Sequence, residues 1–147
     1  MRKKILITDT TLRDGSHAIR HQFTRKQISD YAQGAEAAGV PLITVGHGNG
    51  LGASSLQLGR SLLPDKAILL AARKHLRRTK LGAFVIPGFG TIKENIEPAV
   101  KLGIKALMVA SHCTEANVTQ KHINYAFQKK LTVYGVLMMS HMISARL

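Results

Sequence analysis

The sequence predicts an α/β fold in which a parallel sheet is covered by helices. Short apolar runs rich in β-branched residues alternate with longer stretches whose apolar residues recur at helical spacing. This alternation is typical of a parallel sheet. The 147 residues are enough to bury about 70% of the unfolded surface, and the hydrophobic content of 45% is ordinary for a globular protein. We therefore expect one folded domain over residues 1–147.

The first strand and the first helix have clear sequence signals. Residues 5–7 form a short apolar run that suits a buried strand. Thr24 is a good helix N-cap, and Gln27 stands where a capping box places Glu or Gln. Apolar residues then recur at helical spacing until Gly39, which is typical of a helix end.

The rest of the chain continues the alternation. Thr91 and Glu94 form a second capping box, which begins the third helix. The remaining strands are expected at residues 41–45, 81–86, 104–109 and 131–137, and the remaining helices at residues 65–78, 91–103 and 119–129. Four β-α units and a fifth strand fit either an open doubly wound sheet or part of a (β/α)8 barrel, since a whole barrel needs about 250 residues.

The net charge of +13 raises the question of an anionic partner. The cations are concentrated in residues 2–4, 73–80 and 129–130. The last two runs fall late in expected helices, where cations complement the helix dipole. No aromatic residues are interleaved with them as a base-stacking surface requires. We therefore expect a solvated basic face and no nucleic-acid binding.

The sequence also bounds the compartment. No apolar run reaches membrane-spanning length, and the basic start turns polar too early for a signal peptide. Cys113 is the single cysteine, so no disulfide can form within the chain. We expect a cytoplasmic protein without a membrane partner.

Titratable side chains gather directly after the first strand. Six of them fall within thirteen positions: Asp9, Arg13, Asp14, His17, Arg20 and His21. His47, His112 and His141 follow the second, fourth and fifth strands. Because the carboxyl ends of parallel strands open on one edge, these groups are expected on the same side. His75 and His122 fall within expected helices and are expected to be exposed. The alternative is a solvated charged loop.

Three of these residues form a chemically useful set. Asp14 is a hard oxygen ligand for Mg²⁺ or Mn²⁺. Arg13 can offer paired donors to a carboxylate or a developing enolate oxygen. His17 has the intrinsic pKa of a general base near neutrality. Together they suit bond cleavage beside a carbonyl, although Arg13 and Asp14 could instead form a structural salt bridge.

Several segments together resemble a known family. They are DTTLRDGSHAIRHQFT, VPLITVGHGNGLG, IPGFGT, SHCTEANV and VLMMSHM. In this order they are similar to the amino-terminal half of the 4-hydroxy-2-oxovalerate aldolases. That family belongs to the TLRDG-bearing, metal-dependent lyases that include 3-hydroxy-3-methylglutaryl-CoA lyase. The resemblance covers nearly the whole chain.

The resemblance implies an incomplete (β/α)8 TIM barrel, with about five strands and four helices. It implies cleavage of 4-hydroxy-2-oxovalerate to pyruvate and acetaldehyde with a divalent metal, preferably Mn²⁺, in aromatic hydrocarbon catabolism. Arg13 would bind the substrate and stabilise the pyruvate enolate, Asp14 would bind the metal and the substrate, and His17 would be the catalytic base. An acylating acetaldehyde dehydrogenase would be the partner that receives the acetaldehyde.

Two departures from the family pattern change the expectation. Thr44 stands where the wider group commonly has a glutamate. The family's His-x-His metal ligands, and its substrate-binding serine and tyrosine, correspond to positions beyond residue 147. We expect the chain alone to be inactive and to need a second-half polypeptide or self-association to cover its sheet edge. The alternative is a non-catalytic barrel fragment that acts as an interaction module or is a remnant.

Overall fold

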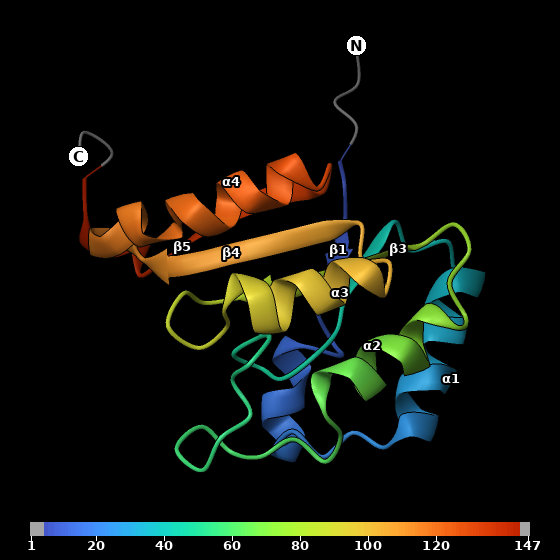
Figure 1. The fold of residues 1–147 in the computed structure, drawn as a ribbon. Helices are drawn as coiled ribbons and strands as arrows, with labels where there is room; N and C mark the ends of the chain where they lie inside the picture. The colour runs from blue at the N-terminus through green and yellow to red at the C-terminus, as the bar shows by residue number, and fades with distance from the viewer. Residues whose placement is uncertain (1–4, 145–147) are drawn as a thin grey trace.

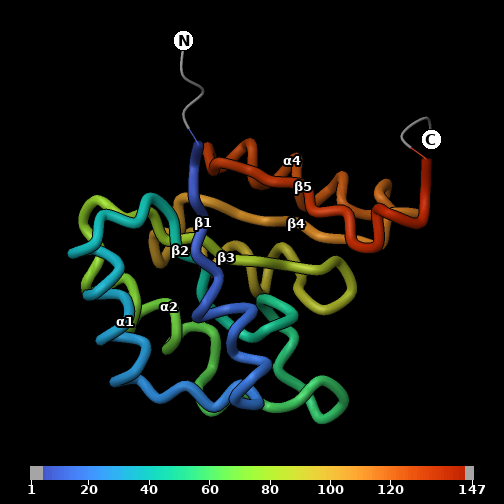
Figure 2. The backbone as a smooth tube through the Cα atoms, turned by 180° about the vertical axis from the view of Figure 1, so that it is seen from behind, coloured from blue at the N-terminus to red at the C-terminus, as the bar shows by residue number. Residues whose placement is uncertain are grey.

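The strands form a single curled sheet. The computed structural model describes residues 5–144. All strands are parallel and lie in the order β1-β2-β3-β4-β5, as half of a barrel (Figures 1 and 2). Their bounds are β1 (Thr8–Asp9), β2 (Leu42–Thr44), β3 (Lys80–Val85), β4 (Ala106–His112) and β5 (Thr132–Met138). A doubly wound sheet reverses its strand order, so this unbroken order selects the half barrel.

The helices follow the strands in chain order and wrap around the sheet (Figure 1). The α-helices are α1 (Arg25–Ala37), α2 (Asp65–Arg73), α3 (Glu97–Lys101) and α4 (Gln120–Gln128). Shorter helical turns are η1 (Asp14–Ile19), η2 (Ile92–Ile96), η3 (Cys113–Thr119) and η4 (Ser140–Met142). Within residues 5–144, no helix has the length and apolar character needed to cross a membrane.

The core lies between the sheet and the inner faces of the helices. Buried strand residues such as Ile43, Val85 and Leu107 pack in one cluster with helix residues such as Ile28 and Leu69. Burying a Leu or Ile side chain contributes about 1.5–3 kcal/mol relative to leaving it exposed. This core fixes the strands, and the polar loops that follow them emerge at their carboxyl ends.

The first helix begins and ends as its sequence predicts. The Thr24 side chain accepts a hydrogen bond from the Gln27 backbone N–H at 3.3 Å, and the Gln27 side chain accepts one from the Thr24 N–H at 2.9 Å. Gly39 follows the helix with a φ of +70°, a conformation that glycine adopts without steric cost. The capping box predicted at Thr24 is therefore confirmed.

The prediction of a buried strand at residues 5–7 was wrong. Ile5, Leu6 and Ile7 are 83%, 56% and 65% exposed. The strand is Thr8–Asp9, and its partner residues begin at Leu42. Pro41 precedes Leu42 and has no backbone N–H to donate. The apolar run therefore extends past the end of the neighbouring strand.

The second helix ends five residues earlier than predicted. The Glu36 carboxylate accepts hydrogen bonds from the backbone N–H groups of Arg77, Arg78 and Thr79 at 2.9–3.2 Å. Backbone donors committed to a side chain of α1 cannot continue a helix. Most of the basic run at residues 74–79 is therefore a loop, which corrects its assignment to the end of a helix.

The third helical segment begins at its predicted N-cap with a different partner. The Thr91 side chain accepts from the Glu94 backbone N–H at 3.1 Å, as a capping box requires. The reciprocal bond runs from the Thr91 N–H to Asn95 Oδ1 at 2.8 Å, in place of Glu94. The helix begins as the π-helical turn η2 and continues as α3.

Candidate active site

The loop after β1 folds into a tight turn anchored by an apolar side chain. The backbone N–H groups of Arg13, Asp14 and Gly15 all donate to the Thr10 carbonyl, at 2.7–3.3 Å. Leu12 is only 2% exposed, and its carbonyl accepts from the Gly46 N–H at 3.1 Å. Leu12 therefore fixes the loop to the core, and the polar residues on either side of it are held in defined positions.

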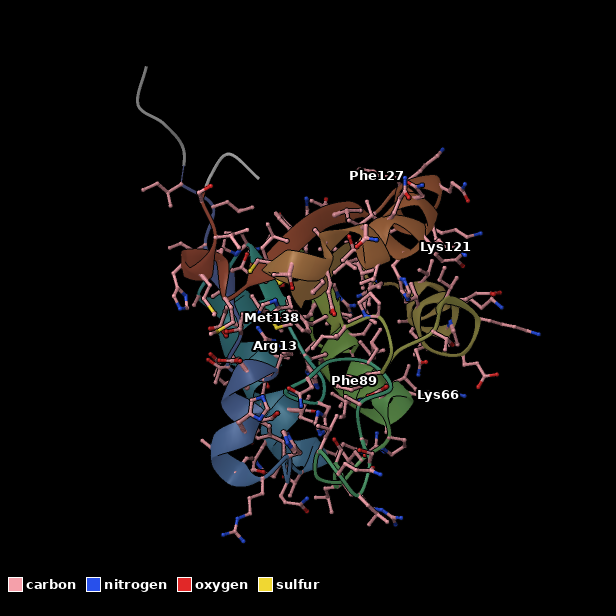
Figure 3. The ribbon with its side chains drawn as sticks, turned by 90° about the vertical axis from the view of Figure 1, so that its left-hand side faces the viewer. Arg13, Lys66, Phe89, Lys121, Phe127 and Met138 are labelled. Atoms are coloured by element: carbon pink, nitrogen blue, oxygen red, sulfur yellow. The ribbon has the colours of Figure 1, made fainter. Side chains whose placement is uncertain are left out.

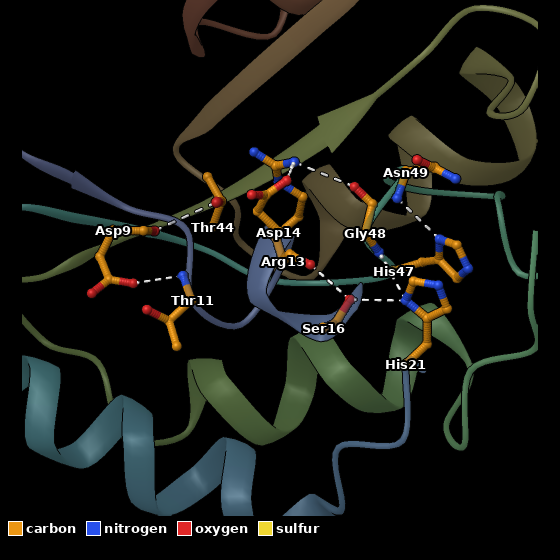
Figure 4. A network of polar contacts seen from close by, with 10 residues as sticks. All are labelled: Asp9, Thr11, Arg13, Asp14, Ser16, His21, Thr44, His47, Gly48 and Asn49. Atoms are coloured by element: carbon orange, nitrogen blue, oxygen red, sulfur yellow. Dashed lines mark hydrogen bonds and ion pairs between the residues drawn. The ribbon is translucent and has the colours of Figure 1, made fainter. Parts of the chain in front are cut away.

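Several contacts hold the Arg13 guanidinium in place (Figure 4). Nη1 donates to Asp14 Oδ1 at 2.8 Å and to the Gly48 carbonyl at 3.3 Å. Cζ lies 4.4 Å from the centre of the Phe84 ring, a cation–π contact with β3. The Arg13 side chain is 13% exposed, and its Nε is buried without a hydrogen-bond partner. An unpaired buried donor of this kind costs about 1–3 kcal/mol.

Burial also affects the charge state of Arg13. Desolvation lowers the pKa of the guanidinium, and the charge of the Asp14 carboxylate opposes that shift. Arginine nevertheless remains protonated in proteins. Asp14 itself is 63% exposed, so its salt bridge with Arg13 leaves carboxylate oxygen accessible to other groups.

His17 and Arg13 contact the same glycine. The His17 ring lies directly over Gly48, where an added Cβ would collide with ring atoms. A Cβ at this position would force the His17 ring to move, so glycine allows this close approach. His17 is exposed, and neither of its ring nitrogens is hydrogen-bonded within residues 5–144. The His17 ring and the Arg13 guanidinium therefore both lie against Gly48.

His21 and His47 form a stacked pair beneath His17. Their ring centres are 3.6 Å apart and their planes differ by 26°, while the His17 ring stands edge-on to His21 at 4.9 Å. The Ser16 hydroxyl donates to the Arg13 carbonyl at 2.7 Å and lies 3.0 Å from His21 Nδ1. Burial lowers the pKa of His21, and the nearby His47 and His17 lower it further. The pKa of His21 therefore lies below the ordinary histidine value in the folded protein.

His47 is a structural residue with no free nitrogen. Its Nδ1 accepts from the Asn49 backbone N–H at 3.0 Å, and its Nε2 donates to the Gly59 carbonyl at 3.0 Å. It is fully buried. The segment between β2 and α2 contains His47, Asn49 and Gly59. These bonds join its glycine-rich first part to its later part, which holds Gly48 in place for Arg13 and His17.

A second carboxylate near β1 is fully engaged. Asp9 accepts from the Thr11 backbone N–H at 2.8 Å and from the Tyr31 hydroxyl at 2.7 Å. Burial raises the pKa of Asp9, but these hydrogen bonds together lower it further, so the net shift is downward. Thr44, where the wider group commonly has a glutamate, is fully buried with its Oγ1 3.5 Å from the Asp9 carbonyl. Asp9 is therefore a structural carboxylate.

The other histidines lie apart from this cluster. His112 ends β4, with its Nδ1 2.8 Å from Thr114 Oγ1, and His141 is exposed in η4. Both follow strand ends as expected, but the structure does not bring them into contact with His17.

His75 lies in the turn after α2 and is half-buried. His122 lies in α4 but is also half-buried, with its Nε2 3.1 Å from the Gly90 carbonyl, so both were wrongly predicted to be exposed.

The residues of the site were partly visible in the sequence. Arg13 and Asp14 form the salt bridge that was the alternative to a catalytic pair, and Arg13 and His17 both lie against Gly48. Their catalytic roles stay predictions. Neither Gly48 nor Phe84 was assigned a role from the residue types, and the stacking of His21 on His47 was not expected. A signal for His21 was its place in the same charged run, but its contact with His47 depends on a positive φ at both Arg20 and His21, which the residue types do not indicate.

The donors of the site do not make a complete metal centre. Within residues 5–144, no group of three or more His, Cys, Asp or Glu side chains is arranged to hold a metal ion. Asp14 is the one accessible carboxylate beside Arg13, and the ring nitrogens of His47 are occupied. The chemistry of these residues does not fit a divalent cation without further ligands.

Comparison with known proteins gives a consistent result. No protein-family model matches the chain. It is 53% identical over 141 residues to 4-hydroxy-2-oxovalerate aldolase of Spirochaeta aurantia, across 96% of this chain and 41% of that protein. It is 51% identical over 144 residues to the protein of the same name in Pectobacterium atrosepticum, across 98% of this chain and 42% of the relative. The chain thus spans about two-fifths of the length of these relatives.

A solved structure supports the fold. A variant carboxyl transferase domain of Rhizobium etli pyruvate carboxylase, solved with pyruvate, matches 91% of this chain and 24% of its own chain with a TM-score of 0.69. The identity of 16% limits this match to the fold. The curated relatives show that this chain is similar, over nearly all of its length, to the amino-terminal half of 4-hydroxy-2-oxovalerate aldolase.

Proposed function

We propose that this chain supplies the proton-accepting and enolate-binding side of an aldolase active site, with 4-hydroxy-2-oxovalerate as the substrate. The observation that carries the proposal is the placement of both Arg13 and His17 against Gly48. It is supported by about 50% identity to proteins named for this activity. A base and a fixed cation beside the carboxyl ends of the strands suit cleavage of a bond beside a carbonyl.

The residues would act in one retro-aldol step. His17 accepts the proton of the substrate's 4-hydroxyl group. The C3–C4 bond breaks, C4 leaves as the carbonyl carbon of acetaldehyde, and the electron pair of that bond passes to C3. The resulting negative charge is shared with the oxygen on C2, and Arg13 stabilises this enolate. Protonation of C3 then gives pyruvate.

Asp14 is proposed as one ligand of a divalent cation, with Mn²⁺ as the metal. Its exposed carboxylate is a hard oxygen donor of the type such ions prefer. Further ligands would have to come from groups outside residues 5–144, because these residues hold no three-ligand cluster. Residues 1–147 alone are therefore proposed to lack turnover.

The test joins residues 1–147 to the part of the Spirochaeta aurantia aldolase that lies beyond its match to this chain. The two parts are assayed as a mixture and as a fusion, with Mn²⁺ and 4-hydroxy-2-oxovalerate. Pyruvate is measured by coupling to lactate dehydrogenase. We expect Arg13→Lys to reduce kcat by about 10²-fold or more, and His17→Gln by about 10²–10⁴-fold.

His141→Gln is the matched control, because His141 is exposed and follows a strand at the same edge. It should leave kcat nearly unchanged. Absence of turnover in both the mixture and the fusion would overturn the proposal. Equal losses in His17→Gln and His141→Gln would instead remove the assigned role of His17.

A second candidate function is that of a non-catalytic interaction module. It is favoured by apolar side chains that remain exposed at the two outer strands of the sheet. Ile5 and Ile7, which precede β1, are 83% and 65% exposed, and Leu137 in β5 is 48% exposed. Exposed apolar residues at an unpaired strand are typical of a protein contact. A fusion that releases pyruvate would reject this candidate, whereas an inactive fusion that still associates through Leu137 would favour it.

A further inference from the structure

A basic hollow lies at the end of the sheet opposite Arg13 and His17. Its volume is about 360 Å³. Lys80 begins β3, Thr132 begins β5, and Lys105 directly precedes β4, and all three line the hollow. It therefore belongs to the amino-terminal edge of the strands and is separate from the candidate active site.

Cations make up most of the wall of this hollow. Its lining contains no Asp or Glu side chain. The cationic residues that line it are Arg73, Arg77, Arg78, Lys80, Lys105 and Lys130. The Glu36 carboxylate lies close by, but it is engaged by backbone N–H groups and lies 3.5 Å from Arg78 Nε.

Helix dipoles account for only part of this charge. The carboxyl ends of α2, α3 and α4 point toward this end of the sheet, since each helix returns the chain to the start of the next strand. Each helix end carries about half a negative elementary charge. Three helix ends and Glu36 offset about two to three of the six cations. A clear positive surplus remains.

Thr79 lines the hollow and is only 5% exposed. Its backbone N–H donates to the Glu36 carboxylate at 2.9 Å, which fixes the residue in place. Its hydroxyl also interacts with that carboxylate and helps to lower the pKa of Glu36. Glu36 is therefore engaged by both the backbone and the side chain of the loop before β3.

We propose that this hollow binds a small phosphate-bearing molecule. Arginine and lysine groups around one space suit the several oxygens of a phosphoryl group. The volume lies in the range of small-molecule sites. No aromatic residue lines the hollow, so it lacks the stacking surface of a single-stranded nucleic-acid site.

The test is calorimetric titration of the whole chain with inorganic phosphate, with chloride at matched ionic strength as the reference. We expect one saturable site per chain. The double variant Lys105→Gln/Lys130→Gln should weaken phosphate binding about tenfold or more, because charge-assisted hydrogen bonds are lost.

The matched control is Lys66→Gln/Lys121→Gln, which removes the same charge from exposed sites outside the hollow (Figure 3). It should leave phosphate affinity unchanged. The proposal fails if the wild-type chain shows no saturable binding or if the control pair weakens binding equally. It also fails if a single-stranded oligonucleotide binds more tightly than phosphate and is unaffected by Lys105→Gln/Lys130→Gln.

Discussion

Gly48 contacts the side chains that are proposed to be catalytic. Its carbonyl accepts from Arg13, its backbone N–H lies 3.4 Å from His21 Nδ1, and its missing Cβ makes room for His17. A Cβ at this position would displace the His17 ring. The loop that follows β2 therefore helps to position Arg13 and His17.

The histidine stack gives the protein a predictable dependence on pH. Burial lowers the pKa of His21, with His47 and His17 adding to the shift. The unfolded chain therefore binds more protons than the folded chain near the ordinary histidine pKa, so stability rises with pH in this range. We expect Tm to fall as the pH drops from about 7.5 through the unfolded pKa of about 6.5.

The variant His21→Asn should flatten this dependence, as followed by thermal melts across the pH series. His141→Gln serves as the comparison, because His141 is exposed and has no contact with the stack. An unchanged pH profile in His21→Asn would show that the buried imidazole does not govern the transition.

Residue types led to the proposed reactive set but not to the contacts that hold it in place. Arg13, Asp14 and His17 were visible because a cation, a carboxylate and a base follow one strand. The stacking of His21 on His47 was not visible, because it depends on positive φ at Arg20 and His21 and on a loop 27 residues away. Contacts of this kind are set by tertiary packing, which a single sequence does not report.

Glu36 links α1 to the loop before β3. Hydrogen bonds from the backbone N–H groups of Thr79, Arg78 and Arg77 lower the pKa of the Glu36 carboxyl to about 2. Since its ordinary value is 4.5, the ionised carboxylate contributes stability above that pH, and this contribution is lost as pH falls toward 2. The loop is thus held by one charged acceptor.

We expect Glu36→Gln to lower Tm at neutral pH and to reduce the loss of stability between pH 4.5 and 2. Acid titration followed by circular dichroism measures both effects. Glu97→Gln is the control, because Glu97 makes an exposed pair with Lys101 four residues along α3, and such pairs contribute little. Equal effects of the two variants would contradict the assigned role of Glu36.

Element types were predictable where the signal was local. The capping box at Thr24 and the glycine after α1 depend on neighbouring residues only, and both are confirmed. The end of α2 was predicted wrongly because it depends on Glu36, which lies 41 residues from Arg77. The first strand was predicted wrongly because its length depends on its pairing with β2. Errors therefore fall where a distant partner decides the boundary.

Within residues 5–144, β5 pairs with β4 on one side and has an open edge on the other. Leu137 is 48% exposed in this strand, Met139 is 47% exposed just after it, and Phe127 on the outer side of α4 is 61% exposed (Figure 3). Unpaired strands with apolar side chains favour association. The net charge of +13 opposes association of identical chains, and salt screens that repulsion.

We therefore expect the mass measured by light scattering to increase with NaCl concentration. Leu137→Ser should reduce this association. Leu56→Ser removes an equally apolar and 80% exposed side chain from a loop far from β5, and should not reduce it. A monomer at every salt concentration would show that the open edge needs no partner.

Arg13, Asp14 and His17 are proposed to form one side of an aldolase site, and residues 5–144 hold no three-ligand metal cluster. The decisive measurement is pyruvate release from 4-hydroxy-2-oxovalerate with Mn²⁺. We expect no release by residues 1–147 alone, and release when the remaining part of the Spirochaeta aurantia aldolase is fused to them. Turnover by the chain alone that disappears in Asp14→Ala would contradict this expectation.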